Sequence, residues 1–161
     1  MQISAKALEK TSAAMQETVR SLLRNKGTDV WSVTTDATVY EAIALMAEKG
    51  IGAVLVLENG KLAGIMSERD YARKVFLRGR SSKETAVREI MSSPVFTVTP
   101  QHTVADCMAL VTDRRIRHLP VVDADSILGV VSIGDVVNAL IHAQADTIEQ
   151  LSNYISGKYP G

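Results

Sequence analysis

The chain has 161 residues, of which 46% are apolar and 22% charged, and its 18 basic and 18 acidic side chains leave no formal net charge. This composition is that of a soluble globular protein of one ordinary domain or two very small ones, and its neutrality argues against a dedicated nucleic-acid binder. The single cysteine excludes an internal disulfide, and no apolar run reaches the length of about 18 residues that a membrane span needs. We therefore expect a reducing compartment, the cytoplasm or, in a eukaryote, the mitochondrial matrix.

The first predicted element is an amphipathic helix over residues 12–25, with apolar side chains on one face and Gly27 as a stop signal. A strand near residues 32–33 follows. The box Thr38-x-x-Glu41 then predicts a helix start, because its hydroxyl and carboxylate can accept hydrogen bonds from free backbone N–H groups. The apolar residues behind this box recur as on one face of a helix: Val39, Ala42, Ile43 and Met46.

Two strands joined by a tight turn come next. We predict them over residues 53–57 and 62–66, with Asn59-Gly60 as a two-residue hairpin turn, because both residues tolerate positive φ. A helix then begins near Asp70, and the polar residues 78–86 connect it to the rest of the chain.

The chain repeats itself with a shift of 65 residues, which aligns residues 33–70 with 98–135 without a gap. The second copy has Ala124-Asp125-Ser126 at the hairpin turn, which predicts a looser connection than in the first copy. Its predicted elements are a strand near 96–98, a helix behind Thr103-x-x-Asp106, strands over 119–122 and 127–131, and a helix near Asp135. Residues 146–155 should form a further amphipathic helix.

The predicted fold class is therefore α/β (α+β), with two β-α-β-β-α repeats flanked by N- and C-terminal helices. Each small sheet has one apolar face that it cannot bury alone, so the repeats should pack on each other. The expected segments are a helical extension (1–27), the first repeat (28–80), a linker (81–86), the second repeat (87–144) and a C-terminal helix and tail (145–161).

Each repeat carries the pattern GxxSxxD, in residues 64–70 and 129–135. Taken singly, a serine before a helix with an acid three residues later is a common capping device. Two copies behind apolar strands also fit a ribose-phosphate unit, because the carboxylate can accept hydrogen bonds from a diol while the hydroxyl and free N–H groups suit a phosphate. The glycine would let a flat base approach the strand.

The sequence resembles the CBS-domain family, named for cystathionine β-synthase, and looks like a stand-alone tandem pair of its domains. The resemblance covers about residues 18–143 and rests on the repeat, the two GxxSxxD segments, VREIM at 87–91, its weaker echo VRSLL at 19–23, and RIRHLPVVD at 115–123. It implies a pseudo-two-fold pair (a Bateman module) with two clefts between the repeats. In the family these clefts bind adenosine-containing ligands, namely AMP, ADP, ATP, NAD or S-adenosylmethionine, and the pair forms a homodimeric disc with a regulatory role.

By matching positions, the resemblance implies that Asp70 and Asp135 hold ribose hydroxyls and that Ser67 and Ser132 approach phosphate. Residues of the other repeat would complete each cleft. The cleft with Asp70 would comprise Ser67, Asp70, Ser92, Val95, Phe96, Ile116, Arg117 and His118. The cleft with Asp135 would comprise Lys26, Thr28, Val30, Ile51, Gly52, Ala53, Ser132 and Asp135.

The two clefts should be unequal. The repeat places the basic segment 115–118 opposite residues 50–53, which carry no charge. The cleft with Asp70 would then hold most of the phosphate-binding cations, and the other cleft mainly Lys26. We therefore expect an anionic nucleotide to prefer the cleft with Asp70.

Two other functions compete with that of a sensor of adenine nucleotides. For an enzyme, the sequence offers no nucleophile beside a base, no P-loop and no metal-ligand spacing among its histidines and cysteine, so we expect neither a catalytic nor a metal site. The alternative is a basic surface that binds a protein or a nucleic acid, although a solvated helix face explains the same charges more simply. These basic residues are Arg69, Arg73, Lys74, Arg78, Arg80, Lys83 and Arg88. The favoured hypothesis remains a regulator of an unidentified partner protein, without membrane contact.

Overall fold

The computed structural model describes residues 5–143, which form two compact units built from interleaved parts of the chain. Of the described residues, the first unit contains 5–28, 98–121 and 130–143, and the second contains 29–97 and 122–129. The mixture of helices and short strands confirms the predicted α/β class. The helix predicted over residues 146–155 lies outside the described residues.

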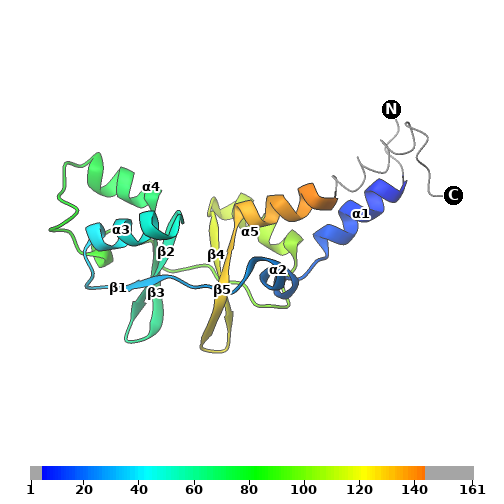
Figure 1. Ribbon diagram of the computed structural model, residues 1–161, viewed down its shortest axis with the longest axis horizontal. Helices are drawn as coiled ribbons and strands as arrows, with labels where there is room; N and C mark the ends of the chain where they lie inside the picture. Colours follow the sequence, from blue (N-terminus) through cyan, green and yellow to red (C-terminus); the bar gives the residue numbers. More distant parts are fainter. Residues whose placement is uncertain (1–4, 144–161) are drawn as a thin grey trace. The chain divides into compact units, whose positions relative to one another are not determined.

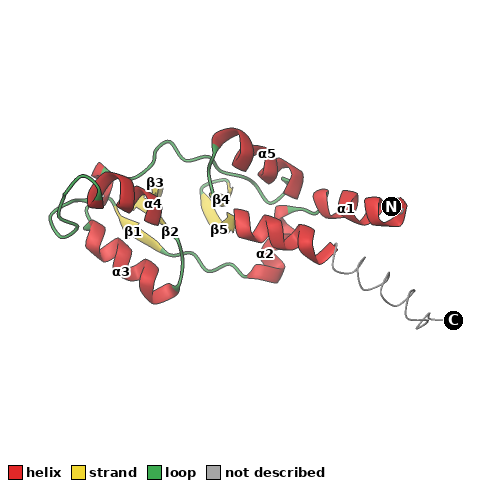
Figure 2. Cartoon of the chain, turned by 90° about the horizontal axis from the view of Figure 1, so that it is seen from above, coloured by secondary structure: helices red, strands yellow, loops and turns green. Residues whose placement is uncertain are grey.

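A three-stranded sheet in the order β1-β2-β3 organises the second unit. Its strands are β1 (Ser32–Thr34), β2 (Ala53–Glu58) and β3 (Lys61–Ser67). β1 and β2 run parallel and β2 and β3 antiparallel, joined by the predicted Asn59-Gly60 turn with φ of 52° and 78°. Helix α3 (Val39–Lys49) connects β1 to β2 and lies beside the sheet (Figure 1, Figure 2).

Two capped helix starts frame this sheet. The predicted box at Thr38 and Glu41 is present at the start of α3. The second box begins α4 (Glu68–Tyr71), where Ser67 is the N-cap and Asp70 the third helical residue, so the helix starts two residues earlier than predicted. The π-helical stretch η1 (Ala72–Phe76) continues α4. Both starts satisfy backbone N–H groups that a helix leaves unpaired.

The core of the second unit lies between the helices and the sheet. Its buried side chains are Val39, Ala42, Met46, Val54, Val56, Met66, Val75, Val87 and Ile90. They come from α3, β2, β3, η1 and the segment around η2 (Val87–Glu89), a short 3-10 helix. The apolar residues predicted on one face of α3 and in the apolar strand over residues 53–57 supply most of this core.

The segment that precedes each repeat packs against the helix of the other repeat. In the second unit, the Val39 N–H donates to the Thr85 carbonyl at 2.9 Å and the Val87 N–H to the Ala37 carbonyl at 2.8 Å. In the first unit, the Val19 N–H donates to the His102 carbonyl at 2.8 Å. The similarity of VRSLL to VREIM thus has a structural basis, because Val19 and Val87 are both fully buried against a helix.

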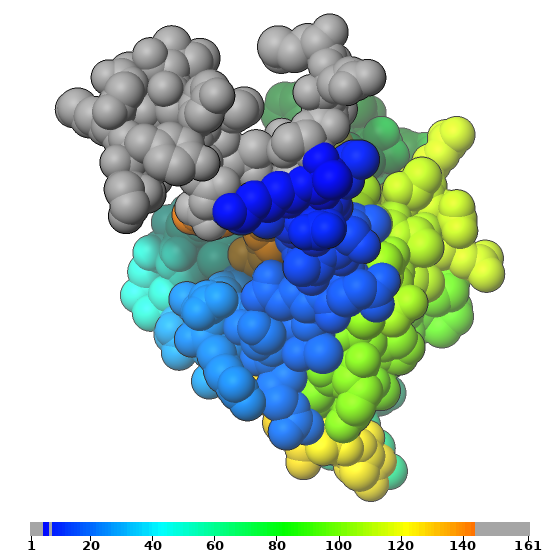
Figure 3. Space-filling model, turned by 90° about the vertical axis from the view of Figure 1, so that its right-hand side faces the viewer, coloured from blue at the N-terminus to red at the C-terminus, as the bar shows by residue number. Residues whose placement is uncertain are grey.

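In the first unit, Val19 belongs to helix α2 (Val19–Lys26), and the segment that it contacts leads into helix α5 (Val104–Arg114). Figure 3 shows the blue N-terminal helices beside the yellow-green segment that leads into α5. The single helix predicted over residues 12–25 is instead two helices, α1 (Ala5–Met15) and α2, because Thr18 is extended and caps α2 by accepting a hydrogen bond from the Ser21 N–H.

The second hairpin comprises β4 (His118–Asp123) and β5 (Ser126–Ser132). Its turn was predicted to be looser, which is wrong: it also has two residues, and Ala124 adopts a φ of 53°. The strand predicted near residues 96–98 is reduced to an isolated parallel bridge between Val98 and Val121. After β5, residues 133–143 are helical. Within the described residues, no helix has both the length and the apolar character needed to cross a membrane.

Candidate functional site

The Ser67–Asp70 pair forms a closed hydrogen-bonded box at the start of α4. Asp70 Oδ2 accepts hydrogen bonds from the Ser67 N–H at 3.0 Å and the Ser67 hydroxyl at 3.1 Å. Asp70 Oδ1 accepts one from the Ser92 hydroxyl at 3.3 Å and lies 3.1 Å from Lys74 Nζ. Both carboxylate oxygens of this buried residue are therefore engaged within the protein.

Lys74 also belongs to the surroundings of Asp70, although the sequence pattern placed it on a solvated helix face. Its ammonium group donates to the Ile90 carbonyl at 2.9 Å as well as contacting Asp70. The signal was present in the sequence as a carboxylate and a lysine four residues apart on one helix, a spacing that brings the two side chains together.

The Ser132–Asp135 pair repeats the box in the first unit with a different set of partners. Asp135 Oδ2 accepts hydrogen bonds from the Ser132 N–H at 2.7 Å and the Ser132 hydroxyl at 3.0 Å. Lys26 Nζ lies 2.6 Å from the same oxygen and also donates to the Val130 carbonyl at 2.5 Å. Asp135 Oδ1 accepts no hydrogen bond from the residues that the structure describes, and this side chain is 20% exposed. Asp135 thus keeps an open acceptor, whereas Asp70 does not.

Within the second unit, a segment that was expected with Asp135 lies beside the Ser67–Asp70 box. Residues 51–53 were expected with Asp135, but they lie at the Ser67 box: Ala53 pairs with Ser67, and the Gly52 carbonyl accepts a hydrogen bond from the Glu68 N–H at 3.0 Å. The physical reason is the antiparallel hairpin, which brings the start of its first strand beside the end of its second.

The structure describes Ile116, Arg117 and His118, which were expected with Asp70, within the other unit. They belong to the first unit, where the Arg117 carbonyl accepts a hydrogen bond from the Ile133 N–H at 2.8 Å, directly after Ser132. Of the other predicted residues, Val95 and Phe96 lie in the unit of Asp70 and Thr28 in the unit of Asp135. Val30, expected with Asp135, lies in the second unit.

Positive charge therefore gathers around Asp135 within its unit. Burial lowers the pKa of His118, and the charges of Lys26 and Arg117 lower it further, while Asp135 opposes them. His118 is neutral near neutral pH, so it can take part in hydrogen bonds without adding a charge.

The lowered pKa of His118 predicts a loss of stability in mild acid. The unfolded chain binds this proton more readily than the folded one, so the contribution is fully present above the ordinary value of 6.5 and is lost as the pH falls below it. Urea unfolding at about pH 7.5 and about pH 5.5 should show a larger loss for the wild type than for His118→Gln. Glu89 and Asp106 also have a lowered pKa. Their contributions to the pH dependence of stability fall at lower pH, because the ordinary pKa values of these acids are 4.5 and 3.8. An equal loss in both proteins would contradict the assignment.

The described residues show little chemistry beyond binding. Burial raises the pKa of Cys107 to about 11, which keeps this thiol protonated. His102 Nδ1 accepts a hydrogen bond from the Thr99 N–H at 2.8 Å and so caps a turn. Within residues 5–143, no three His, Cys, Asp or Glu side chains are placed to hold a metal ion.

Most of the basic residues in the middle of the chain have partners inside the protein. Lys74 contacts Asp70, Arg80 lies 2.7 Å from Glu89, and Arg88 pairs with Asp36. The ammonium of Lys83 lies over the Tyr40 ring. Cations that are committed to such pairs are less available to the phosphates of a nucleic acid.

Comparison with known proteins identifies the family. The model of the CBS domain matches residues 19–76 and 87–142. The mitochondrial CBS domain-containing protein CBSX3 of Arabidopsis thaliana is 43% identical over 152 residues, which cover 88% of this chain and 73% of that protein. YhcV of Bacillus subtilis is 32% identical over 130 residues, 81% of this chain and 85% of that protein.

A solved structure agrees with this result. A protein with CBS domains from Burkholderia ambifaria is 50% identical and superposes with a TM-score of 0.75, over 78% of this chain and 94% of that one. Both matched regions contain a hairpin followed by a Ser–Asp box, the arrangement described above. The chain belongs to the CBS-domain family and carries two copies of the domain.

Proposed function

We propose that this chain is a regulatory module that binds adenosine-containing ligands at its Ser–Asp boxes and so modulates a partner protein. CBS domains are in general regulatory, ligand-binding modules, and the chain resembles stand-alone members. The ligand would be AMP, ADP, ATP, NAD or S-adenosylmethionine, and we propose no catalytic role. The partner protein is unidentified.

The observation that carries the proposal is the open oxygen of Asp135. A ribose hydroxyl can donate a hydrogen bond to Oδ1 while Oδ2 keeps the box closed. Lys26 and Arg117 supply positive charge at the same site, as their effect on His118 indicates, and this charge favours an anionic ligand.

This arrangement reverses the preference expected from the sequence. A ligand at Asp70 must compete with Lys74 and Ser92 for Oδ1, whereas a ligand at Asp135 meets no such competition from the described residues. We therefore propose that Asp135 holds the stronger site for an anionic nucleotide and Asp70 the weaker one.

Titration calorimetry with AMP, ATP, NADH and S-adenosylmethionine tests this proposal on the wild type, Asp135→Asn and Asp70→Asn. Loss of a hydrogen bond to a charged group costs about 1.5–3 kcal/mol, so Asp135→Asn should weaken the best ligand by about tenfold to a hundredfold. Asp70→Asn should have a smaller effect on that ligand.

The matched control is Asp106→Asn, which alters the capping box at the start of α5 without touching a GxxSxxD segment. This variant should bind as the wild type does. If none of the four ligands binds the wild type, the sensor proposal fails. If Asp70→Asn loses as much affinity as Asp135→Asn, or more, the proposed order of the sites is wrong.

We also propose that the chain forms a homodimer. CBS-CP12 proteins from cyanobacteria, 30% identical with a TM-score of 0.68, are hexameric, so oligomers occur among its relatives. A ligand that binds better to one arrangement of the subunits or of the two repeats shifts the population toward it, and this shift would be the regulatory signal. We keep the cytoplasm as the expected compartment, although the Arabidopsis relative is named as mitochondrial.

A further inference from the structure

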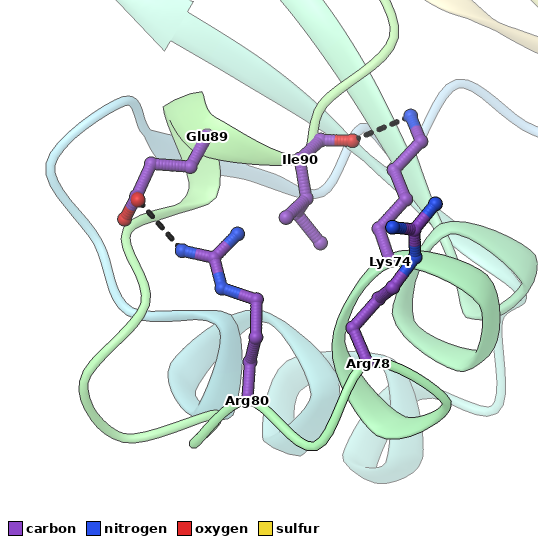
Figure 4. Close-up of a pocket in the computed structure, with 5 residues that line it drawn as sticks. All are labelled: Lys74, Arg78, Arg80, Glu89 and Ile90. Carbon is purple, nitrogen blue, oxygen red and sulfur yellow. Dashed lines mark hydrogen bonds and ion pairs between the residues drawn. The ribbon is translucent and has the colours of Figure 1, made fainter.

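A basic pocket opens in the second unit beyond the Ser67–Asp70 box. It has a volume of about 410 Å³ and is lined by Lys74, Arg78, Arg80, Glu89 and Ile90. Figure 4 shows side chains from η1 and the turn after it, from the end of η2 and from Ile90 around one hollow. Three cations and one carboxylate leave the lining with an excess of positive charge.

The charges of this pocket are only partly compensated. Arg80 is paired with Glu89 at 2.7 Å, and Lys74 is held by the Ile90 carbonyl and by Asp70. Arg78 makes no hydrogen bond or ion pair with any residue in the described part of the chain. An arginine on a pocket wall without a carboxylate partner presents its whole planar set of N–H donors to a ligand.

The chain turn at the end of η1 holds the two arginines. Gly79 has a φ of 65°, and its N–H donates to the Phe76 carbonyl at 3.2 Å. The Arg80 N–H donates to the Val75 carbonyl at 3.0 Å. This hydrogen-bonded turn brings Arg78 and Arg80 into the lining of the same pocket.

We propose that this pocket binds a compact oligophosphate anion, with Arg78 as its first ligand and Arg80 and Lys74 as further donors. Arginine forks match the geometry of phosphate oxygens, and a concave pocket with surplus positive charge favours a small, multiply charged anion. The site differs from the Asp70 box, since it uses side chains one and more helical turns beyond that residue.

The anion has two sources with the same chemistry, a free oligophosphate or the phosphate tail of a nucleotide whose ribose is held at Asp70. Lys74 contacts both Asp70 and the pocket, so one ligand could use both places. The second source rests on the proposed function, whereas the first does not.

Calorimetric titration of the full chain with pyrophosphate, tripolyphosphate, AMP and ATP separates these sources. Arg78→Gln should weaken the binding of pyrophosphate or tripolyphosphate by about tenfold or more, the effect of losing one charge-assisted contact. Arg78 is exposed and unpaired among the described residues, so this variant should keep its fold. Glu89→Gln should strengthen binding several-fold, because it removes the carboxylate that competes for Arg80.

Arg73→Gln is the matched control, an exposed arginine in η1 that does not line the pocket. If oligophosphate binding depends on Arg78 but not on Asp70, the natural ligand is a free oligophosphate. If ATP binds but the oligophosphates do not, and its binding needs both Arg78 and Asp70, the anion is the phosphate tail of a nucleotide.

Three results would overturn the proposal. They are the absence of any Arg78-dependent binding, an equal loss in Arg73→Gln, and Arg78-dependent binding of single-stranded DNA without binding of either oligophosphate. The proposed function fails on a separate result, since it requires an adenosine ligand whose binding depends on Asp135 or Asp70. Pyrophosphate binding can therefore succeed where nucleotide binding fails.

Discussion

Alanine at position 64 is expected to lower the free energy of unfolding by about 1–3 kcal/mol, the usual cost of overpacking a core. Gly64 is buried in β3, and a Cβ there would lie 2.6 Å from Met91 Sδ and 3.0 Å from the Ser92 carbonyl oxygen. The thioether can move, but the backbone oxygen is held by the pairing of Ser92 with Ile65. Urea unfolding of the wild type and Gly64→Ala measures the loss.

A double-mutant cycle with Met91→Ala shows whether the contact is the cause. Removing the Met91 side chain should make Gly64→Ala less costly, with a coupling of about 0.5 kcal/mol or more between the two positions. Gly134→Ala is the control, because its Cβ would meet only Ser132 Oγ, at 3.5 Å. Additive effects in the cycle, or equal losses at positions 64 and 134, would show that the close approach of residues 91–92 is not what requires a glycine.

The role of Gly64 could not be predicted from the sequence. The glycine was interpreted as making room for a flat base, but the space above it is filled by Met91 and Ser92. The Ile65 N–H donates to the Ser92 carbonyl at 3.1 Å, and the Ser92 N–H donates to the Ile65 carbonyl at 2.9 Å. Nothing in the local pattern of residues 64–70 reveals a contact with a segment so distant in the chain.

What the sequence did predict depends on interactions between near neighbours. The four capping boxes that begin α3, α4, α5 and the last described helix join residues three apart, so their hydroxyl and carboxylate partners can be identified by spacing. The hairpins follow from alternation and from two-residue turns. Such features need no knowledge of the tertiary structure, and the structure contains the four boxes and both hairpins, although the second turn is tighter than predicted.

Within each unit, the predicted hairpins decide which segment lies beside each Ser–Asp box. An antiparallel pair places residue 53 opposite residue 67, so the end of the uncharged segment 51–53 lies beside the Ser67–Asp70 box. By the same geometry the basic segment 115–118 lies beside the Ser132–Asp135 box, where the Arg117 carbonyl accepts a hydrogen bond from the Ile133 N–H. The inequality of the two sites survives as a proposal, with its direction reversed.

Aspartate in place of Ile141 or Phe76 is expected to dissociate the proposed homodimer. Phe76 is 68% and Leu77 73% exposed at the end of η1, and Ile141 is 55% exposed on the last described helix. Phe76 and Ile141 are 65 residues apart, so they are equivalent positions of the two repeats. Large apolar side chains that remain exposed at the same position in both repeats form the surface on which the proposed second subunit would pack.

The last described helix carries this surface as a stripe. Ile133, Val137 and Ile141 recur every fourth residue, which places them on one helix face, and all three are exposed. Burying a side chain of this size contributes about 1.5–3 kcal/mol, so each substitution should weaken the dimer by roughly tenfold to a hundredfold, and more where a charge enters the interface. Sedimentation velocity over a range of concentrations measures the change.

Two further variants decide which helices form the contact. Lys61→Asp introduces the same side chain at the exposed start of β3 and should leave the dimer intact. Leu8→Asp tests the terminal helix α1, whose Leu8 is also exposed. Dissociation by Leu8→Asp alone would move the interface to α1 and leave the equivalent positions 76 and 141 without a partner. A wild type that sediments as a monomer at all concentrations would remove the subunit arrangement as a source of the regulatory signal, which would then have to arise within one chain.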